Sequence, residues 1–184
     1  MTETIADRYR RLATQFADTI NAVDPHRWND QSPCEDWSTL DVLRHEIETQ
    51  GLVLCLVGRE LRPGPPPGSD PLGAWISASG QIQERLDDPV EAGEEFDGPD
   101  GPMTFAALVD KLLSFDLIVH RWDLGQSMDG EIVIPPGDVA WAFDAARSLG
   151  EDIRLEGVCG PAADPPENAD EQTRLLAYLG RKAW

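Results

Sequence analysis

The segment that decides the fold runs from Thr104 to Leu124 and reads TFAALVDKLLSFDLIVHRWDL. Drawn as an α-helix, it is apolar around most of its circumference, and Asp116 and His120 interrupt the apolar surface. A helix that is apolar on nearly all sides is stable in water only when other elements surround it. The segment therefore predicts a buried central helix.

Other segments show apolar residues at three- and four-residue steps, which is the period of a helix with one buried face. We expect helices over Ile5–Val23, from Ser38 to the stop at Gly58, over Leu72–Leu86 behind the start signal Asp70-Pro71, over Val139–Leu149, and a short one over Leu175–Leu179 that stops at Gly180. Four main helices predict an all-α four-helix bundle, with a short extra helix and a C-terminal tail, folded as a single domain over residues 1–184.

The second of these helices has the clearest start, because Ser38 can cap it and Asp41 completes a capping box. Trp37 and Val42 stand at the two positions of a hydrophobic staple around that cap. We assign an inward-facing stripe to Val42, His45, Thr49, Leu52, Val53 and Leu56, and expect Cys55 to pack in the core.

Proline and glycine exclude a helix from the stretch after the second helix, Arg59–Ser69, which contains RPGPPPGS. A proline-rich chain of this length extends roughly 30 Å, at about 3.1 Å per residue. A helix of about 20 residues is also roughly 30 Å long, so the linker can cross the bundle and let the third helix run parallel to the second. We expect a further loop from about Pro89 to Pro102.

Fifteen basic and 34 acidic residues give the chain a formal charge of −19. Such a chain repels nucleic acids and anionic membrane surfaces, so we expect neither as a partner. No apolar run approaches the length of a membrane span, and the N-terminus MTETIADRYRR has no apolar signal region. We therefore expect a cytoplasmic protein.

The three cysteines, Cys34, Cys55 and Cys159, match neither a zinc-ribbon spacing nor a CxxC redox pair. We expect reduced thiols. Cys34 lies four residues before the helix cap at Ser38, so we interpret it as packed rather than reactive.

Asp116 and His120 are four residues apart in the central helix, a spacing that puts their side chains next to each other. A carboxylate and an imidazole at this spacing can bind one metal ion. A charged side chain buried in an apolar helix is costly unless a partner of opposite charge, such as a metal ion, compensates it. His45 can complete the set from a facing helix. Two histidines and one carboxylate suit zinc, nickel or ferrous iron, with positions left open.

The same residues also allow an ordinary structural interpretation. Asp116 and His120 could pair with each other, and His45 could be a core histidine satisfied by hydrogen bonds. The D-xxx-H motif is short and does not separate the two interpretations. Asp123 has two open roles as well: it could orient a ligand from behind, or pair with a nearby arginine.

Three longer stretches resemble a known family: SPCEDWSTLDVLRHEIE from Ser32, FDLIVHRWDLGQSMDG from Phe115 and RLLAYLGRKAW from Arg174. They are similar to the DinB-like metal-binding helical proteins of actinobacteria, and above all to the group related to the N-terminal domain of mycothiol-dependent maleylpyruvate isomerase. The resemblance implies a four-helix bundle in up-down-down-up order, which agrees with the long linker.

The resemblance also implies a metal site, whose ligands fall on His45, Asp116 and His120. The resembled isomerase has Glu where this chain has Asp116, so the ion is expected closer to the central helix. That isomerase also has a C-terminal domain that contributes to its active site, and this sequence has no counterpart to it. The resemblance therefore does not carry over the isomerase's particular reaction.

Two hypotheses about function follow. In the first, the protein is a metal-dependent mycothiol S-transferase or isomerase, with zinc, or else nickel or iron, as the ion. Mycothiol would be the co-substrate and a small electrophile the substrate, in a monomer or homodimer. In the second, the bundle is a non-catalytic protein that binds a metal or a small ligand. The sequence identifies no catalytic residue.

Overall fold

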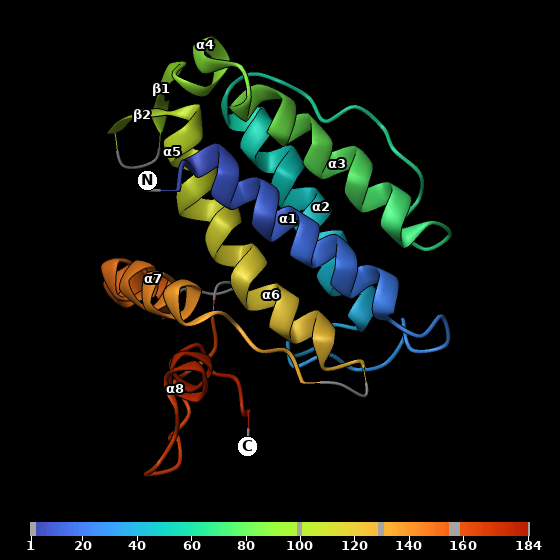
Figure 1. Ribbon diagram of the computed structural model, residues 1–184, viewed down its shortest axis with the longest axis vertical. Helices are drawn as coiled ribbons and strands as arrows, with labels where there is room; N and C mark the ends of the chain where they lie inside the picture. Colours follow the sequence, from blue (N-terminus) through green and yellow to red (C-terminus); the bar gives the residue numbers. More distant parts are fainter. Residues whose placement is uncertain (1–2, 99–100, 129–130, 155–158, 184) are drawn as a thin grey trace.

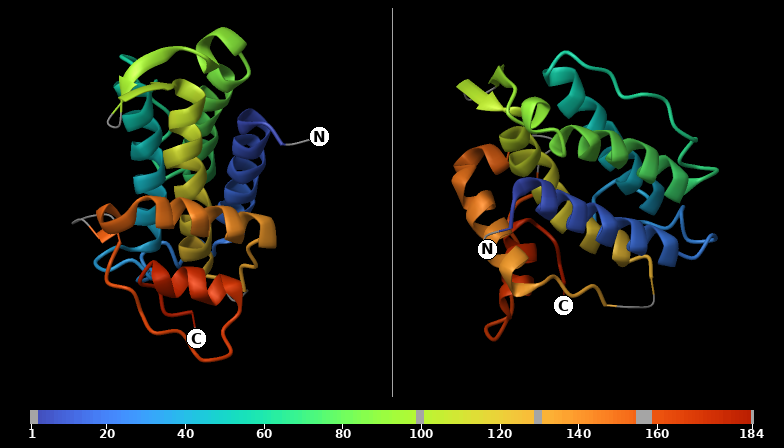
Figure 2. Two further views of the ribbon diagram at one scale, coloured as in Figure 1. Left: turned by 90° about the vertical axis from the view of Figure 1, so that its left-hand side faces the viewer. Right: turned by 45° about the horizontal axis from the view of Figure 1, so that its top comes forward.

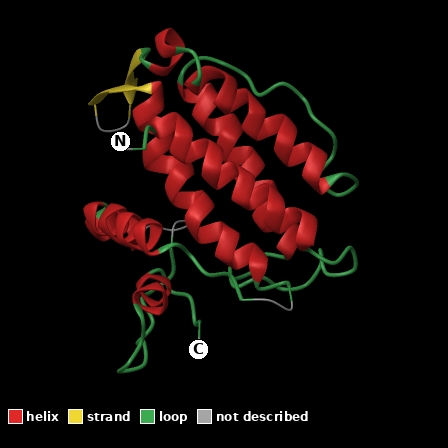
Figure 3. Cartoon of the chain, viewed as in Figure 1, coloured by secondary structure: helices red, strands yellow, loops and turns green. Residues whose placement is uncertain are grey.

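Four long helices form the body of the protein in the computed structural model, which describes residues 3–98, 101–128, 131–154 and 159–183. Helices α1 (Ile5–Ala22), α2 (Thr39–Leu56), α3 (Pro71–Leu86) and α6 (Phe115–Gly125) make up the bundle (Figure 1; Figure 3). Because α3 and α6 each pack against both α1 and α2, the latter two occupy opposite corners. The prediction of an all-α four-helix bundle is confirmed.

The linker between α2 and α3 runs along the outside of the bundle, so α3 begins at the same end as α2 and runs parallel to it (Figure 1). This is the up-down-down-up order that the linker length allowed. The predicted start signals are present on both helices. Ser38 and Asp41 form the capping box of α2, and the Asp70 side chain accepts a hydrogen bond from the Gly73 amide at 2.9 Å ahead of α3.

The buried face of α2 is rotated from the predicted one. Leu52 is 53% exposed, Leu56 is 39% exposed, and Cys55 is exposed as well, so placing these three in the core was wrong. The buried face instead carries polar side chains at Glu46 and Gln50, both 0% exposed. Because the prediction looked for apolar residues, it left out Glu46 and Gln50 and placed the exposed Leu52 and Leu56 on the buried face.

The segment expected to be a loop between α3 and the central helix contains regular structure, so that prediction is wrong. A short helix α4 (Pro89–Ala92) precedes an antiparallel hairpin of β1 (Glu95–Gly98) and β2 (Gly101–Thr104). Phe96 pairs with Met103 across the hairpin, and both are half-buried against the core. Strands of four residues are too short for an alternating pattern to show in the sequence.

The central helix is not uniform. It consists of α5 (Phe105–Val109), a π-helical turn (Asp110–Ser114) and α6. A π-helical turn adds a residue to the helical repeat and often lies at functional sites. This one ends shortly before Asp116. The α-helical period predicted one continuous α-helix, and no glycine or proline marks the turn in the sequence.

The C-terminal part lies beside the bundle. Helix α7 (Pro136–Ser148) runs across α6 and contacts α8 (Glu171–Tyr178), with a 3₁₀ segment (Gly150–Arg154) in between (Figure 2). The two helices confirm the predicted extra helix and the short C-terminal helix. No helix in the described ranges combines the length and the hydropathy needed to span a membrane.

Candidate metal centre

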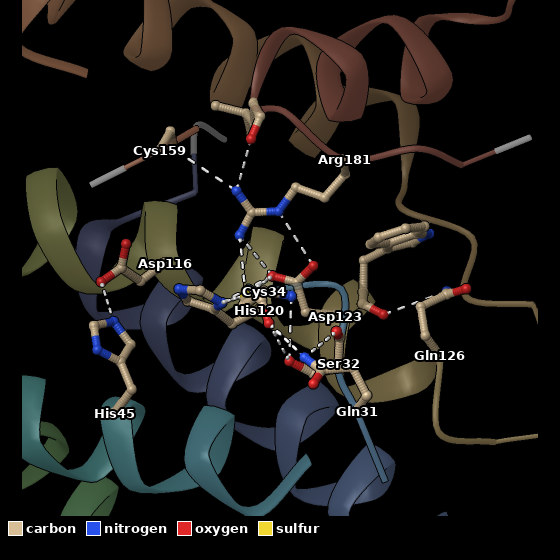
Figure 4. Close-up of polar contacts among 12 residues, drawn as sticks. Gln31, Ser32, Cys34, His45, Asp116, His120, Asp123, Gln126, Cys159 and Arg181 are labelled. Carbon is tan, nitrogen blue, oxygen red and sulfur yellow. Dashed lines mark hydrogen bonds and ion pairs between the residues drawn. The ribbon is translucent and has the colours of Figure 1, made fainter. Parts of the chain in front are cut away.

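The structure brings together the three residues that the sequence singled out as metal ligands. Asp116 and His120 lie one turn apart on α6, and His45 faces them from α2 (Figure 4). His45 Nε2 is 3.6 Å from Asp116 Oδ2, and one donor atom from each residue lies within 4.8 Å of the others. Two facing helices thus present three donors to one point.

The spacing and the chemistry of these donors fit a divalent ion. In a tetrahedral site with bonds of about 2.0–2.1 Å, neighbouring ligand atoms are about 3.3–3.4 Å apart, close to the His45–Asp116 separation. The side chains of His45, Asp116 and His120 are 31%, 25% and 11% exposed. His45 and Asp116 are therefore partly exposed to solvent, whereas His120 is nearly buried.

His120 pairs with Asp123 rather than with Asp116. His120 Nδ1 lies 2.9 Å from Asp123 Oδ2, and the Asp123 side chain is fully buried. An acceptor at Nδ1 fixes the proton there, so Nε2 is the nitrogen that remains free for a ligand. This geometry differs from the ordinary pairing of Asp116 with His120 that the sequence also allowed.

Both roles left open for Asp123 are present in the structure, since it contacts His120 and also an arginine. Arg181 Nη2 donates to Asp123 Oδ2 at 2.7 Å, and Arg181 Nε donates to Oδ1 at 3.2 Å. Burial opposes ionisation of Asp123, but the Arg181 charge and the hydrogen bonds from His120 and Arg181 outweigh it and lower the pKa of Asp123 well below its usual range. Asp123 is therefore a carboxylate at neutral pH.

Cys34 lies next to both His120 and Asp123. Its Sγ donates to Asp123 Oδ2 at 3.4 Å and is 4.0 Å from His120 Nδ1. Burial and the Asp123 charge raise the pKa of the Cys34 thiol to about 12, so it stays protonated at neutral pH. The interpretation of Cys34 as unreactive fits this environment.

Cys34, His120 and Asp123 form a second group of potential metal donors. The guanidinium of Arg181 already lies against this group, with Nη2 3.6 Å from Cys34 Sγ and 2.7 Å from Asp123 Oδ2. The Arg181 guanidinium thus already neutralises the negative charge of Asp123, and it would repel a metal ion bound to this second group of donors. The first donor group is the better candidate for an ion.

Trp37 forms an aromatic wall of the site that the sequence did not reveal. Its ring centroid is 4.8 Å from that of His45 and 6.0 Å from that of His120. The Trp37 carbonyl accepts from the Ser32 amide at 2.9 Å, and Asp36 turns the chain with φ = 63°. In the sequence, Trp37 stood out as part of a staple at the helix start and of the first stretch that resembles the family, but neither feature placed it beside the two histidines.

Glu46, next to His45 on α2, was also missed. It is 0% exposed, and neither of its carboxylate oxygens has a hydrogen-bond partner within the described part of the chain. Burial, reinforced by the charges of Asp116 and Asp123, raises the pKa of Glu46 well above its usual value. The raised pKa favours the neutral acid over the carboxylate, which limits the cost of burying this side chain in the core.

Fold and donor set together define an all-α four-helix bundle with a candidate divalent-metal site between two facing helices. Residues 9–125 match the family model of the mycothiol maleylpyruvate isomerase N-terminal domain. Since this range is more than half of the 184 residues, the chain belongs to that family. Searches of curated proteins and of solved structures gave no significant match.

The matched range includes His45, Asp116, His120 and Asp123, and it ends at the last residue of α6. Arg181, which completes the environment of Asp123, lies outside it. Arg181 is followed along the chain by KAW and preceded by a helix stop at Gly180, and neither feature points to a partner 58 positions away.

Proposed function

We propose that this protein is a metal-dependent enzyme with mycothiol as its co-substrate. It either transfers mycothiol to a small electrophilic substrate or isomerises that substrate. Membership of the mycothiol maleylpyruvate isomerase N-terminal domain family supports the choice of thiol. The observation that carries the proposal is the convergence of His45, Asp116 and His120, with donor atoms within 4.8 Å, at a site exposed on one side.

A zinc ion held by three protein ligands keeps at least one position open and favours the thiolate form of a bound thiol. The chain's own residues supply the rest. His45 and His120 supply imidazole nitrogens, Asp116 supplies a carboxylate oxygen, and the Trp37 ring packs beside both imidazoles. The exposed edge at His45 and Asp116 admits the thiol and its electrophile.

The reaction balances without a redox partner. The thiol sulfur forms a bond to one carbon of an activated double bond, the π bond breaks, and the thiol proton ends on the neighbouring carbon. Release of the thiol from this adduct, with return of the proton, regenerates the double bond and can leave it in the other geometry. Retention of the adduct is transfer, and release is isomerisation.

The test measures metal content first and turnover second. Purified protein is analysed for bound metals, loaded with zinc, and assayed for consumption of mycothiol with a generic electrophile. The proposal expects turnover that disappears in His45→Ala. It also expects turnover to persist in His26→Ala, since His26 is an exposed loop residue. Metal bound without any thiol consumption would contradict the enzyme proposal and favour the non-catalytic binder.

A further inference from the structure

Arg181 reaches the candidate site from outside the bundle. It follows α8, yet its side chain is only 8% exposed and ends against Asp123 on α6 (Figure 4). Its Nη1 donates to the Leu179 carbonyl at 2.9 Å, while Nη2 and Nε both bond to Asp123. A guanidinium is buried only when its charge and donors are satisfied, and here Asp123 supplies the opposite charge.

The end of α8 fixes the position from which Arg181 reaches in. The Arg181 amide donates to the Leu176 carbonyl at 2.8 Å, and the Gly180 amide donates to the Ala177 carbonyl at 3.0 Å. These two bonds are those of a Schellman motif, in which the residue after the helix cap is left-handed. Gly180 has φ = 83°, as the motif requires. The sequence Leu-Gly-Arg therefore sets the direction of the arginine locally.

One carboxylate oxygen of Asp123 contacts both Arg181 and His120. Asp123 Oδ2 is 2.7 Å from Arg181 Nη2 and 2.9 Å from His120 Nδ1. The guanidinium is planar, and its two bonds to one carboxylate restrict rotation of that carboxylate. The orientation of His120 thus depends on a residue of the C-terminal segment.

We propose that Arg181 is a positioning residue for the metal site. Its two hydrogen bonds hold the Asp123 carboxylate against Nδ1 of His120, which fixes the imidazole in the tautomer with a free Nε2. The inference rests on the proposed metal site. It adds that the segment from α8 to Arg181, outside the family-matched range, determines how tightly that site binds its ion.

The coupling is reciprocal. If the docked arginine strengthens ion binding, then the bound ion must strengthen docking of the arginine by the same free energy. The inference can therefore be tested from both ends, by substitution at Arg181 and by the response of the C-terminal segment to metal.

The first test is zinc affinity, measured by competition with a chromophoric chelator on the full chain. Removal of an outer partner of a ligand commonly costs about 10–100-fold in metal affinity, so Arg181→Gln should weaken zinc binding by at least about 10-fold. Arg181→Lys keeps the charge and should recover part of the loss. The matched control is Arg154→Gln, because Arg154 donates to the Gly160 and Tyr178 carbonyls and ties the same segment together. It should retain wild-type affinity.

A double-variant comparison shows whether Arg181 acts through Asp123. Adding Arg181→Gln to Asp123→Asn should weaken zinc binding no further, since the carboxylate that Arg181 orients is already gone. Wild-type affinity in folded Arg181→Gln overturns the inference, and so does a full additional loss in the double variant. Absence of zinc binding by the wild-type chain would instead contradict the proposed function.

The second test needs no variant. Hydrogen exchange of wild-type protein should show that zinc slows exchange of the amides from α8 to Arg181. Exchange in this segment that zinc leaves unchanged, in protein shown to bind the ion, would overturn the inference even if the Arg181 variants did not fold.

Discussion

Nδ1 of His120 lies 2.9 Å from the buried Oδ2 of Asp123, so the imidazole turns its other nitrogen toward the side where Asp116 and His45 lie. The Asp123 carboxylate holds His120 in the tautomer whose Nε2 is free to bind an ion. His120 is thus oriented as a ligand by a residue outside the proposed donor set.

Metal binding should stabilise the fold. An ion at 100 times its Kd adds about 2.7 kcal/mol, which for a protein of this size corresponds to a Tm increase of roughly 5–10 °C. Thermal unfolding of the metal-free and zinc-loaded chain measures this shift, with Asp116→Ala as the variant that should not respond. An identical Tm after verified removal and addition of metal would contradict a site between α2 and α6.

The three thiols should differ in reactivity. Cys55 is exposed on α2, whereas burial raises the pKa of both Cys34 and Cys159. A disulfide reagent at neutral pH should modify Cys55 rapidly and the other two only on unfolding, because the thiolate is the reacting form. Mass spectrometry of peptides after brief labelling gives the order. Rapid labelling of Cys34 in the native protein would make it a candidate nucleophile.

Replacing Glu46 should stabilise the protein without loss of metal. A buried polar group with no partner costs about 1–3 kcal/mol, and methionine has a similar volume with no such group, so Glu46→Met should raise the free energy of unfolding by about that amount. Denaturant unfolding and metal analysis measure the two quantities. A more stable variant that has lost metal or turnover would assign Glu46 to the working site.

Much of the fold followed from patterns local in the sequence. The capping box at Ser38, the Asp70-Pro71 start and the linker length fixed helix starts and chain direction, because each acts over a few residues. The hairpin at Phe96 and Met103 did not follow, since its strands are only four residues long. The π-helical turn before Asp116 has no composition signal at all.

The candidate site was only partly predictable for the same reason. Asp116 and His120 are neighbours in one helix, so their proximity follows from helix geometry. His45 was a candidate because it lies on the inward-facing stripe of the second helix, and the family resemblance supported it. Trp37 and Arg181 lie in stretches that resemble the family, but their contacts with the site residues arise only in the tertiary fold.

Replacing a proposed metal ligand should weaken metal binding more than replacing a residue that only supports a ligand. His45→Ala, Asp116→Ala and His120→Ala should each weaken metal binding by more than the roughly 10–100-fold typical of losing an outer partner. Asp116→Glu should retain the ion, because it keeps the carboxylate and adds one methylene. Metal content after dialysis against a weak chelator measures the series, with His26→Ala as the control. Wild-type content in all three alanine variants would show that the ion lies elsewhere.

The most direct test of the central claim is whether a thiol reaches an ion held by His45, Asp116 and His120. Cobalt(II) is loaded in place of zinc, and absorption is recorded while mycothiol or a simple thiol is added. We predict a new thiolate-to-metal charge-transfer band that saturates with thiol in the wild-type chain and is absent in His45→Ala. Protein that binds cobalt at this site but develops no such band at any thiol concentration would contradict the account.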